Sequence, residues 1–274
     1  MTDSGGTPPA EAGAGPARRR ETALITGASS GIGLELARLF AANGSDLVLV
    51  ARSDDRLRDL AAELEGKFGI SAQALAADLT RPDSAGEIAT ELASRGVQVD
   101  VLVNNAGFGA HGQVATLGVE RQLDVIEVNI AALTRLTALF LPAMLERKHG
   151  AVLNVASTAA FQPGPNQAVY CATKAYVLSF TEALAEEVRG TGVHVSCLAP
   201  GATDTQFAAQ AEMTGTLAFR MGTMAAGPVA QAGYAGLRRD QTLVIPGLLN
   251  RAMALSVRVA PRALVARLAG RIQA

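Results

Sequence analysis

Short, almost wholly apolar segments alternate with longer amphipathic ones from residue 22 onward. The apolar segments are rich in Val, Ile and Leu, as expected for strands that helices cover on both faces. The pattern therefore predicts an α/β fold, a single doubly wound Rossmann domain with about seven parallel strands and helices on both faces. The predicted strands are 22–26, 46–51, 71–77, 99–103, 151–156, 193–198 and 242–245.

The segments between these strands have apolar positions three and four residues apart, which is the spacing of an amphipathic helix. No internal repeat and no second linker interrupts the alternation, so we expect one domain over residues 21–246. The clearest predicted helices are 32–42, 56–68, 118–147 and 167–189.

The two ends of the chain differ from this body. Residues 1–20 are mostly small or Pro without apolar periodicity, which predicts a disordered tail ending in a solvated arginine junction at 18–20. Residues 247–274 contain five arginines and no acid among Leu, Val and Met, and Pro261 is expected to divide them into two helices. Two interpretations are open for this basic extension. The sequence favours packing on the body over peripheral contact with anionic lipid.

Composition excludes several classes of protein. The 274 residues carry 25 acids and 24 bases, and a net charge of −1 argues against a nucleic-acid binder. Cys171, Cys197 and three histidines have neither disulfide nor metal-ligand spacing, so no metal is expected. The N-terminus lacks an apolar signal region, and the longest apolar stretch, 131–145, contains Arg135 and Pro142. We therefore expect a cytoplasmic protein.

A glycine-rich turn joins the first strand to the first helix. Gly27 permits a tight bend, Gly31 lets the backbone approach a pyrophosphate, and Gly33 allows close packing of helix on strand. The helix N-terminus, with its partial positive charge, then faces the phosphates. This context predicts a dinucleotide site.

The residue after the second strand indicates which dinucleotide is bound. An acid that binds the ribose is expected there, but Ala51 is followed by Arg52. A guanidinium can bind a 2′-phosphate with two hydrogen bonds, which favours NADP(H) over NAD(H). The alternative is that Arg52 only pairs with Asp54 or Asp55 at the surface.

Tyr170 and Lys174 are four residues apart in a helical stretch, so their side chains share one helix face. A neighbouring ammonium lowers the pKa of a phenol, and such a tyrosine becomes a usable proton donor and acceptor. Ser157 follows the fifth strand, at the sheet edge where open α/β folds bind ligands. Its hydroxyl could donate a hydrogen bond to a substrate oxygen.

Together these motifs resemble the short-chain dehydrogenase/reductases over residues 22–246, and in particular their core-type, NADP-preferring members. The resemblance implies a catalytic tetrad. Tyr170 exchanges a proton with the substrate oxygen, while Lys174 lowers the tyrosine pKa and holds the nicotinamide ribose. Ser157 positions the oxygen, and Asn129 anchors a water. The implied cofactor contacts also include Gly27, Ser29, Ser30, Gly31, Ile32, Gly33, Arg52, Asp78, Leu79, Asn105, Ala106, Gly107, Pro200, Gly201, Thr203 and Thr205, with Tyr170 and Lys174.

The expected function is hydride transfer between NADP(H) and a carbonyl or alcohol. By resemblance, residues 204–225 lie over the substrate, and their Phe, Leu and Met side chains suggest an apolar ketone or aldehyde. The resemblance also implies a homodimer or homotetramer formed through the helical stretches 118–147 and 167–189. The alternative is a non-catalytic NADP(H)-binding module with a regulatory or membrane-surface role.

Overall fold

A seven-stranded sheet runs through the centre of the chain, whose computed structural model describes residues 19–205 and 223–272. The strand order is β3-β2-β1-β4-β5-β6-β9, and every neighbouring pair is parallel. This confirms the predicted doubly wound sheet. The strands are β1 (Thr22–Thr26), β2 (Asp46–Ala51), β3 (Ala72–Ala76), β4 (Val101–Asn104), β5 (Gly150–Val155), β6 (Val193–Leu198) and β9 (Leu243–Val244).

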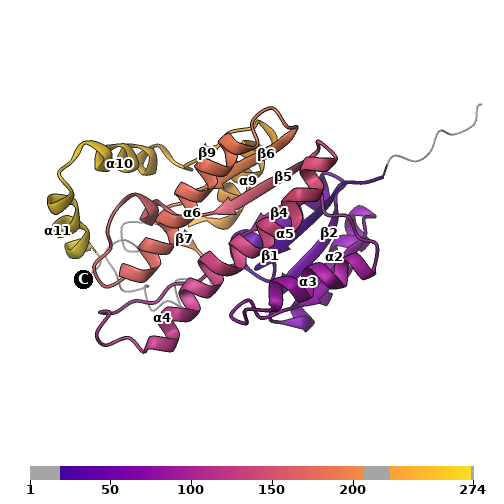
Figure 1. Cartoon of the computed structure of the whole chain (residues 1–274), viewed down its shortest axis with the longest axis horizontal. Helices are drawn as coiled ribbons and strands as arrows, with labels where there is room; N and C mark the ends of the chain where they lie inside the picture. Colours follow the sequence, from indigo (N-terminus) through magenta and orange to yellow (C-terminus); the bar gives the residue numbers. More distant parts are fainter. Residues whose placement is uncertain (1–18, 206–222, 273–274) are drawn as a thin grey trace, which may run out of the picture.

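Helices cover both faces of the sheet (Figure 1). One core lies under α1 (Gly31–Ala42), α2 (Asp54–Phe68) and α9 (Ala226–Arg238). The other lies under α3 (Ser84–Ser94), α5 (Leu133–Glu146) and α6 (Ala168–Glu187). Successive strand side chains point to opposite faces, so Ala23 and Ile25 enter the first core and Leu24 enters the second.

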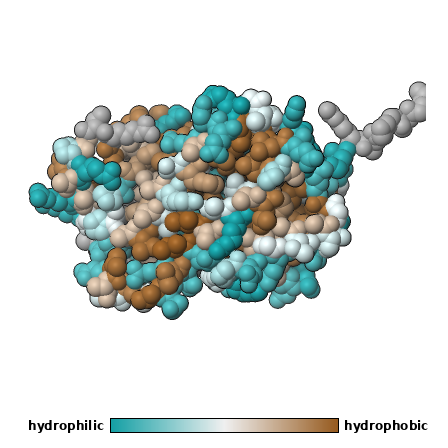
Figure 2. All heavy atoms as spheres, in the orientation of Figure 1, coloured by the Kyte–Doolittle hydropathy of each residue, from teal (hydrophilic) through white to brown (hydrophobic). Residues whose placement is uncertain are grey.

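The predicted helix at 118–147 is continuous but not uniform. It consists of α4 (Val119–Ile126), a π-helical segment at Glu127–Ala132, and α5, which continues through Pro142. Val119–Glu146 is long and apolar enough to cross a membrane, but the core helix of a soluble protein meets the same criteria. Its α5 part buries Leu136 and Met144 in the second core. Apolar residues remain exposed over α4, where Figure 2 shows a brown patch at the lower left.

The order of the strands determines where a ligand can bind. The chain proceeds from β1 outward to β2 and β3, and then returns to place β4 on the other side of β1. The connections after β1 and β4 therefore leave in opposite directions and open a crevice at the carboxyl ends of these strands. A second, two-stranded ladder that the sequence pattern did not predict pairs β7 (Thr203–Asp204) with β8 (Met224–Ala225).

The start of the described chain contacts the body. Arg19 Nη2 lies 2.6 Å from both carboxylate oxygens of Asp100, and Arg20 donates to the Gly69 carbonyl at 2.6 Å. The predicted solvated junction is therefore wrong for Arg19. The physical reason is that the Asp100 carboxylate is 1% exposed and needs a cationic partner. The predicted tail up to residue 18 lies outside the described residues.

The basic extension forms two helices, α10 (Leu248–Val259) and α11 (Arg262–Ile272). They are separated at Pro261, as predicted. In Figure 1 they are the yellow helices at the left end of the molecule, outside both helical layers.

Candidate active site

The glycine turn after β1 is packed too tightly for side chains. Gly27 has a φ of +66°, in the left-handed region that glycine adopts readily. A Cβ on Gly33 would lie 2.3 Å from the Gly27 carbonyl oxygen and 2.4 Å from Nδ2 of Asn105. The structure thus agrees with the tight bend and the close packing predicted for these two glycines.

Two polar side chains hold this turn against β4. The Thr26 hydroxyl accepts hydrogen bonds from the backbone N–H groups of Asn105 and Ala106, both at 3.0 Å. The Asn105 amide donates to the carbonyl of Thr26 at 2.8 Å and to that of Gly27 at 3.3 Å. Asn105, predicted as a cofactor contact, therefore positions the turn in this structure.

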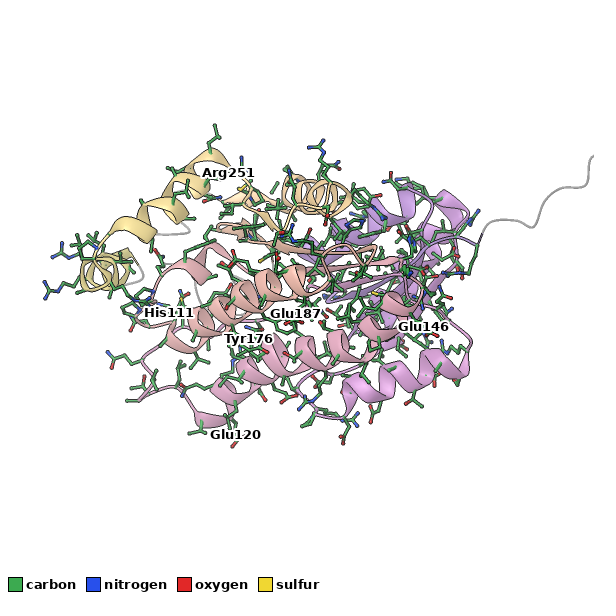
Figure 3. The ribbon with its side chains drawn as sticks, turned by 45° about the horizontal axis from the view of Figure 1, so that its top comes forward. His111, Glu120, Glu146, Tyr176, Glu187 and Arg251 are labelled. Atoms are coloured by element: carbon green, nitrogen blue, oxygen red, sulfur yellow. The ribbon has the colours of Figure 1, made fainter. Side chains whose placement is uncertain are left out.

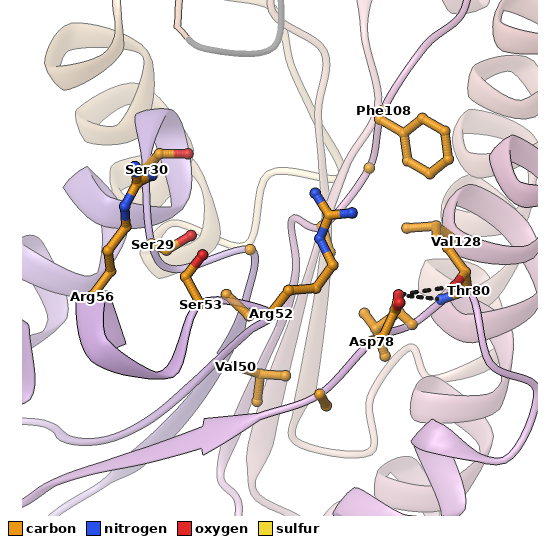
Figure 4. Close-up of a pocket in the computed structure, with 16 residues that line it drawn as sticks. Ser29, Ser30, Val50, Arg52, Ser53, Arg56, Asp78, Thr80, Phe108 and Val128 are labelled. Carbon is orange, nitrogen blue, oxygen red and sulfur yellow. Dashed lines mark hydrogen bonds between the residues drawn. The ribbon is translucent and has the colours of Figure 1, made fainter. Parts of the chain in front are cut away.

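A cleft of about 800 Å³, including space open to solvent, lies beside the turn (Figure 4). Its walls come from the glycine turn and from the segments after β2, β3 and β4. Many of the predicted cofactor residues line it, namely Gly27, Ser29, Ser30, Arg52, Asp78, Leu79, Ala106 and Gly107. The structure thus brings together residues that lie up to 80 positions apart, as the Thr26–Ala106 contact shows.

Arg52 extends its guanidinium into this cleft (Figure 4). Among the residues that the structure describes, it has no hydrogen-bond or ion-pair partner. Asp54 instead pairs with Arg58 at 2.7 Å, so the surface pair considered for Arg52 does not form with that acid. Arg56, in the first turn of α2, lines the same cleft. The sequence interpretation missed Arg56, although its place in the first turn of the helix that follows Arg52 could have indicated it.

The opposite wall of the cleft is ordered by Asp78. Its Oδ1 accepts hydrogen bonds from the backbone N–H and the hydroxyl of Thr80, at 3.1 and 2.9 Å. The Ser84 hydroxyl donates to the Asp78 carbonyl at 2.5 Å. These contacts shape the loop after β3, and Thr80 is a further lining residue that the sequence interpretation missed.

The predicted catalytic residues lie together near the carboxyl end of β5. Ser157 precedes a short 3-10 helix, Thr158–Phe161, and its hydroxyl accepts the Ala159 N–H at 3.1 Å. The same hydroxyl is hydrogen-bonded to Tyr170. Tyr170 and Lys174 are both buried on α6, four residues apart, as predicted from their spacing. The Ser157–Tyr170 contact depends on α6 packing against the end of the sheet.

Burial controls the protonation of this pair. It raises the pKa of Tyr170 above its usual value, and the hydrogen bond from Ser157 offsets only part of that rise. It lowers the pKa of Lys174 to about 8. The expected lowering of the tyrosine pKa by Lys174 is therefore not observed. The reason is geometric, because Nζ donates to the Val155 carbonyl at 2.8 Å and lies 5.9 Å from the tyrosine ring centroid.

Asn129 lies in the π-helical segment between α4 and α5. Its Oδ1 accepts the Phe108 N–H at 3.1 Å, while Nδ2 donates to the Phe108 carbonyl and to the Thr173 hydroxyl, both at 3.0 Å. Single turns of π-helix are rare and often occur at functional sites. The amide therefore joins the loop after β4 to α6. Thr173, which the sequence interpretation missed, is its partner on α6.

Gly107 connects the cleft to this buried cluster. A Cβ placed on it would lie 2.9 Å from Asn129 Oδ1 and 3.3 Å from Lys174 Nζ. Because Gly107 also lines the cleft, a ligand that passes it reaches the amide oxygen and the ammonium. The open cleft and the predicted catalytic residues are thus adjacent at Gly107.

The segment 200–205 contacts both the loop after β5 and the start of α1. The Pro200 carbonyl accepts the Thr158 N–H at 2.8 Å, and Thr203 Oγ1 donates to the Gly201 carbonyl at 2.9 Å. A Cβ on Gly31 would lie 2.9 Å from the Thr205 methyl. Gly31 and Ile32, both predicted cofactor contacts, form the start of α1. The predicted substrate segment 204–225 is described only at 204, 205 and 223–225. Its remaining residues lie outside the described ranges.

These residues fit an elongated dinucleotide. A Cβ on Gly31 would lie 2.9 Å from Thr205 and a Cβ on Gly107 would lie 2.9 Å from Asn129, so glycine at both positions keeps this space open. Arg52, without a described partner, supplies a cation at the far end of the cleft. The glycine turn and the N-terminus of α1 can hold the phosphates between these ends.

Comparison with known proteins agrees with this geometry. The family model for short chain dehydrogenases matches residues 21–214. The very-long-chain 3-oxoacyl-CoA reductase of Homo sapiens is 36% identical over 202 residues, which are 72% of this chain. The matched part is 64% of that relative, so this chain spans less than two thirds of its length.

Two solved structures are similar over most of the chain. The short-chain dehydrogenase from Sphingobium yanoikuyae, in complex with NADPH, is 34% identical with a TM-score of 0.78, covering 89% of this chain and 97% of that one. The bulky-bulky ketone specific alcohol dehydrogenase from Comamonas testosteroni is 31% identical with a TM-score of 0.74, covering 89% and 96%. Sheet order, site geometry and these matches agree, and the chain belongs to the short-chain dehydrogenase family, oxidoreductases that use a nicotinamide cofactor.

Proposed function

We propose that this protein catalyses the NADPH-dependent reduction of an apolar ketone or aldehyde, or the reverse oxidation, with Tyr170 as general acid or base. The observation that carries the proposal is the hydrogen-bonded Ser157–Tyr170 pair beside the buried Lys174. This cluster adjoins, at Gly107, a cleft that fits the dinucleotide. A protein that only bound the cofactor would have no need of this cluster.

The cofactor, when bound, supplies the hydride, and the protein orients the reactants and moves the proton. Burial keeps the Tyr170 hydroxyl protonated at neutral pH, so it can donate its proton to the carbonyl oxygen of the substrate. Ser157 can donate a hydrogen bond to the same oxygen while negative charge develops there. The Lys174 ammonium, which the Val155 carbonyl holds at 2.8 Å, would hydrogen-bond the nicotinamide ribose of the bound cofactor.

The preference for NADPH rests on Arg52. Its guanidinium lies in the cleft at the expected position of the adenosine ribose and has no partner among the described residues. A 2′-phosphate would give it a charge-assisted partner, which NAD(H) lacks. Arg56 lines the same wall and adds a second positive charge. The complex of the Sphingobium relative with NADPH supports the same cofactor.

The proposed substrate class rests on the relatives and on the described part of the site. The Comamonas relative is specific for bulky-bulky ketones, and the human relative reduces very-long-chain 3-oxoacyl-CoA. Both activities require room for a large carbonyl compound. In this chain the Phe108 ring borders the cleft on the side of Asn129. These features support a bulky, largely apolar carbonyl.

The test is the NADPH absorbance of purified protein mixed with aldehydes, cyclic ketones, ketoacyl thioesters and ketosteroids. Tyr170→Phe is expected to lower turnover at least a hundredfold, because general acid catalysis is lost. NADPH binding, followed by fluorescence, should persist. Tyr176→Phe is the matched control, since Tyr176 lies on the same helix and its hydroxyl is hydrogen-bonded to Thr134 at 2.9 Å. Full activity in Tyr170→Phe would contradict the mechanism. NADPH binding without turnover would support the non-catalytic alternative.

A further inference from the structure

Among their described side chains, the helices α10 and α11 bury a narrow strip of small apolar residues. Ala254 on α10 and Val265 and Ala269 on α11 are buried against the rest of the chain. Large apolar side chains on the same helices face solvent instead. They are Leu248, which is 84% exposed, Leu249, Met253, Leu255, Leu264 and Leu268. Packing on the body therefore uses the smaller face and leaves the larger apolar face uncovered.

The charged residues of α10, α11 and the residues around them are all basic. Residues 247–274 contain five arginines and no acid, although the whole chain has a net charge of −1. Arg251, Arg262, Arg267 and Arg271 are exposed on the two helices, next to the leucines. Figure 3 labels Arg251 on α10, at the end of the molecule opposite to Glu146. Arginines beside exposed leucines on short helices are typical of segments that lie in the interface of an anionic bilayer.

We propose that α10 and α11 form a peripheral docking surface for an anionic lipid bilayer. The leucines enter the boundary between headgroups and acyl chains, and the arginines contact the phosphates. A spanning role is excluded for this segment, because its apolar helical stretch, Leu248–Val257, is much shorter than the roughly 20 residues needed. Symmetric pairing with the same face of a second copy would place arginines against arginines without any acid to compensate.

The position of this surface links it to the candidate site. Asn250 on α10 packs against Gly201, where an added Cβ would lie 2.6 Å from the Asn250 amide, and its Nδ2 lies 3.5 Å from Met224 Sδ. On α11, Gly270 packs against Pro165. Docking would therefore hold Gly201, a predicted cofactor contact, and Met224, in the predicted substrate segment, close to the lipid surface, where an apolar substrate concentrates.

The test is co-sedimentation of the full chain with vesicles of phosphatidylcholine alone or mixed with phosphatidylserine. We expect binding to the mixed vesicles that weakens as salt is raised, and little binding to the neutral ones. Arg251→Gln should weaken binding about fivefold, and Arg251→Gln combined with Arg267→Gln about 25-fold, since each arginine near an anionic surface contributes about 1 kcal/mol. Leu248→Gln with Leu255→Gln should weaken binding at least tenfold.

Matched controls lie outside α10 and α11. Arg239→Gln removes an exposed charge at the end of α9, and Val119→Gln removes an exposed apolar side chain on α4. Both should bind vesicles like the unaltered chain. Equal binding to neutral and anionic vesicles, or unchanged binding by the double variants, would overturn the proposal. Light scattering provides a second test, because a leucine variant that dissociates an oligomer while the unaltered chain ignores vesicles would assign this face to a second copy instead.

Discussion

The ammonium of Lys174 lies 5.9 Å from the centroid of the Tyr170 ring, but its hydrogen bond goes to the Val155 carbonyl, 2.8 Å away. The two groups are thus close enough to interact electrostatically without being bonded to each other. Burial shifts their pKa values in opposite directions, upward for the phenol and down to about 8 for the ammonium. Both groups are then neutral above about pH 8, and this determines the pH dependence expected of the enzyme.

We expect kcat/KM for carbonyl reduction to fall as pH rises through about 8. The raised pKa of Tyr170 keeps its proton in place, so the change reports the loss of charge on Lys174. Lys174→Arg keeps a positive charge at all accessible pH values and should move the fall upward, even if its activity is lower. A fall at the same pH in both proteins would show that another group titrates.

The same pKa predicts a pH-dependent stability of the protein without cofactor. The pKa of lysine is about 10.4 in the unfolded chain, so between pH 8 and 10.4 the unfolded state binds more protons than the folded one. The free energy of unfolding should therefore rise with pH in this window, by roughly 3 kcal/mol relative to Lys174→Met. Urea unfolding of both proteins at pH 7 and 10 measures this difference. An unchanged difference would mean that Lys174 titrates normally.

Arg52→Ala should raise KM for NADPH about ten- to a hundredfold and leave KM for NADH nearly unchanged. The reason is that only NADPH carries the 2′-phosphate that would pair with the Arg52 guanidinium. Arg56→Ala should have a smaller effect in the same direction. Arg58→Ala is the control, since Arg58 is 71% exposed and pairs with Asp54. Steady-state kinetics with both cofactors provide the comparison. Equal losses for NADPH and NADH in Arg52→Ala would argue against recognition of the phosphate.

Thr173→Val should lower kcat about five- to thirtyfold with little change in KM, because it removes the hydroxyl that holds the Asn129 amide. Thr173→Ser should restore activity. Thr181→Val is a matched control, because Thr181 is also buried on α6 and also accepts an asparagine amide hydrogen bond, from Asn154. It should lose comparable stability and retain kcat. If both valine variants lose kcat equally, the effect of Thr173 is only structural.

Arg19→Ala should lower the free energy of unfolding by about 1–2 kcal/mol at neutral pH, because it removes a cation bonded to the buried Asp100 carboxylate. The loss stays below that of a fully buried pair, because the Arg19 side chain is half exposed. Burial acts to raise the pKa of Asp100, but hydrogen bonds from Arg19, Thr22 and Gln98 outweigh it and hold the pKa below its usual value. The stabilisation is therefore present above about pH 4 and lost as pH falls through the folded-state pKa. Arg20→Ala, next in the chain, should have little effect. Equal losses in both variants would contradict a specific role for the pair.

Much of the fold could be predicted because its signals are local. Apolar runs such as 46–51 can be buried on both faces only in a covered parallel sheet, and the tight turn at Gly27 requires glycine whatever surrounds it. Helical spacing likewise placed Tyr170 and Lys174 on one face of α6. The role of Thr173 was missed because it depends on Asn129, which is distant in the chain.

The order of strands and helices along the chain, the glycine turn and the spacing of Tyr170 and Lys174 could all be predicted from the sequence. These properties follow from backbone geometry within a few residues. The tertiary structure was needed to show how burial changes the pKa values of Tyr170 and Lys174, because desolvation depends on everything packed around a group. It also decided that Arg19 neutralises Asp100, some 80 residues away, and that the leucines of α10 and α11 face solvent. Such contacts exist only after distant segments have come together.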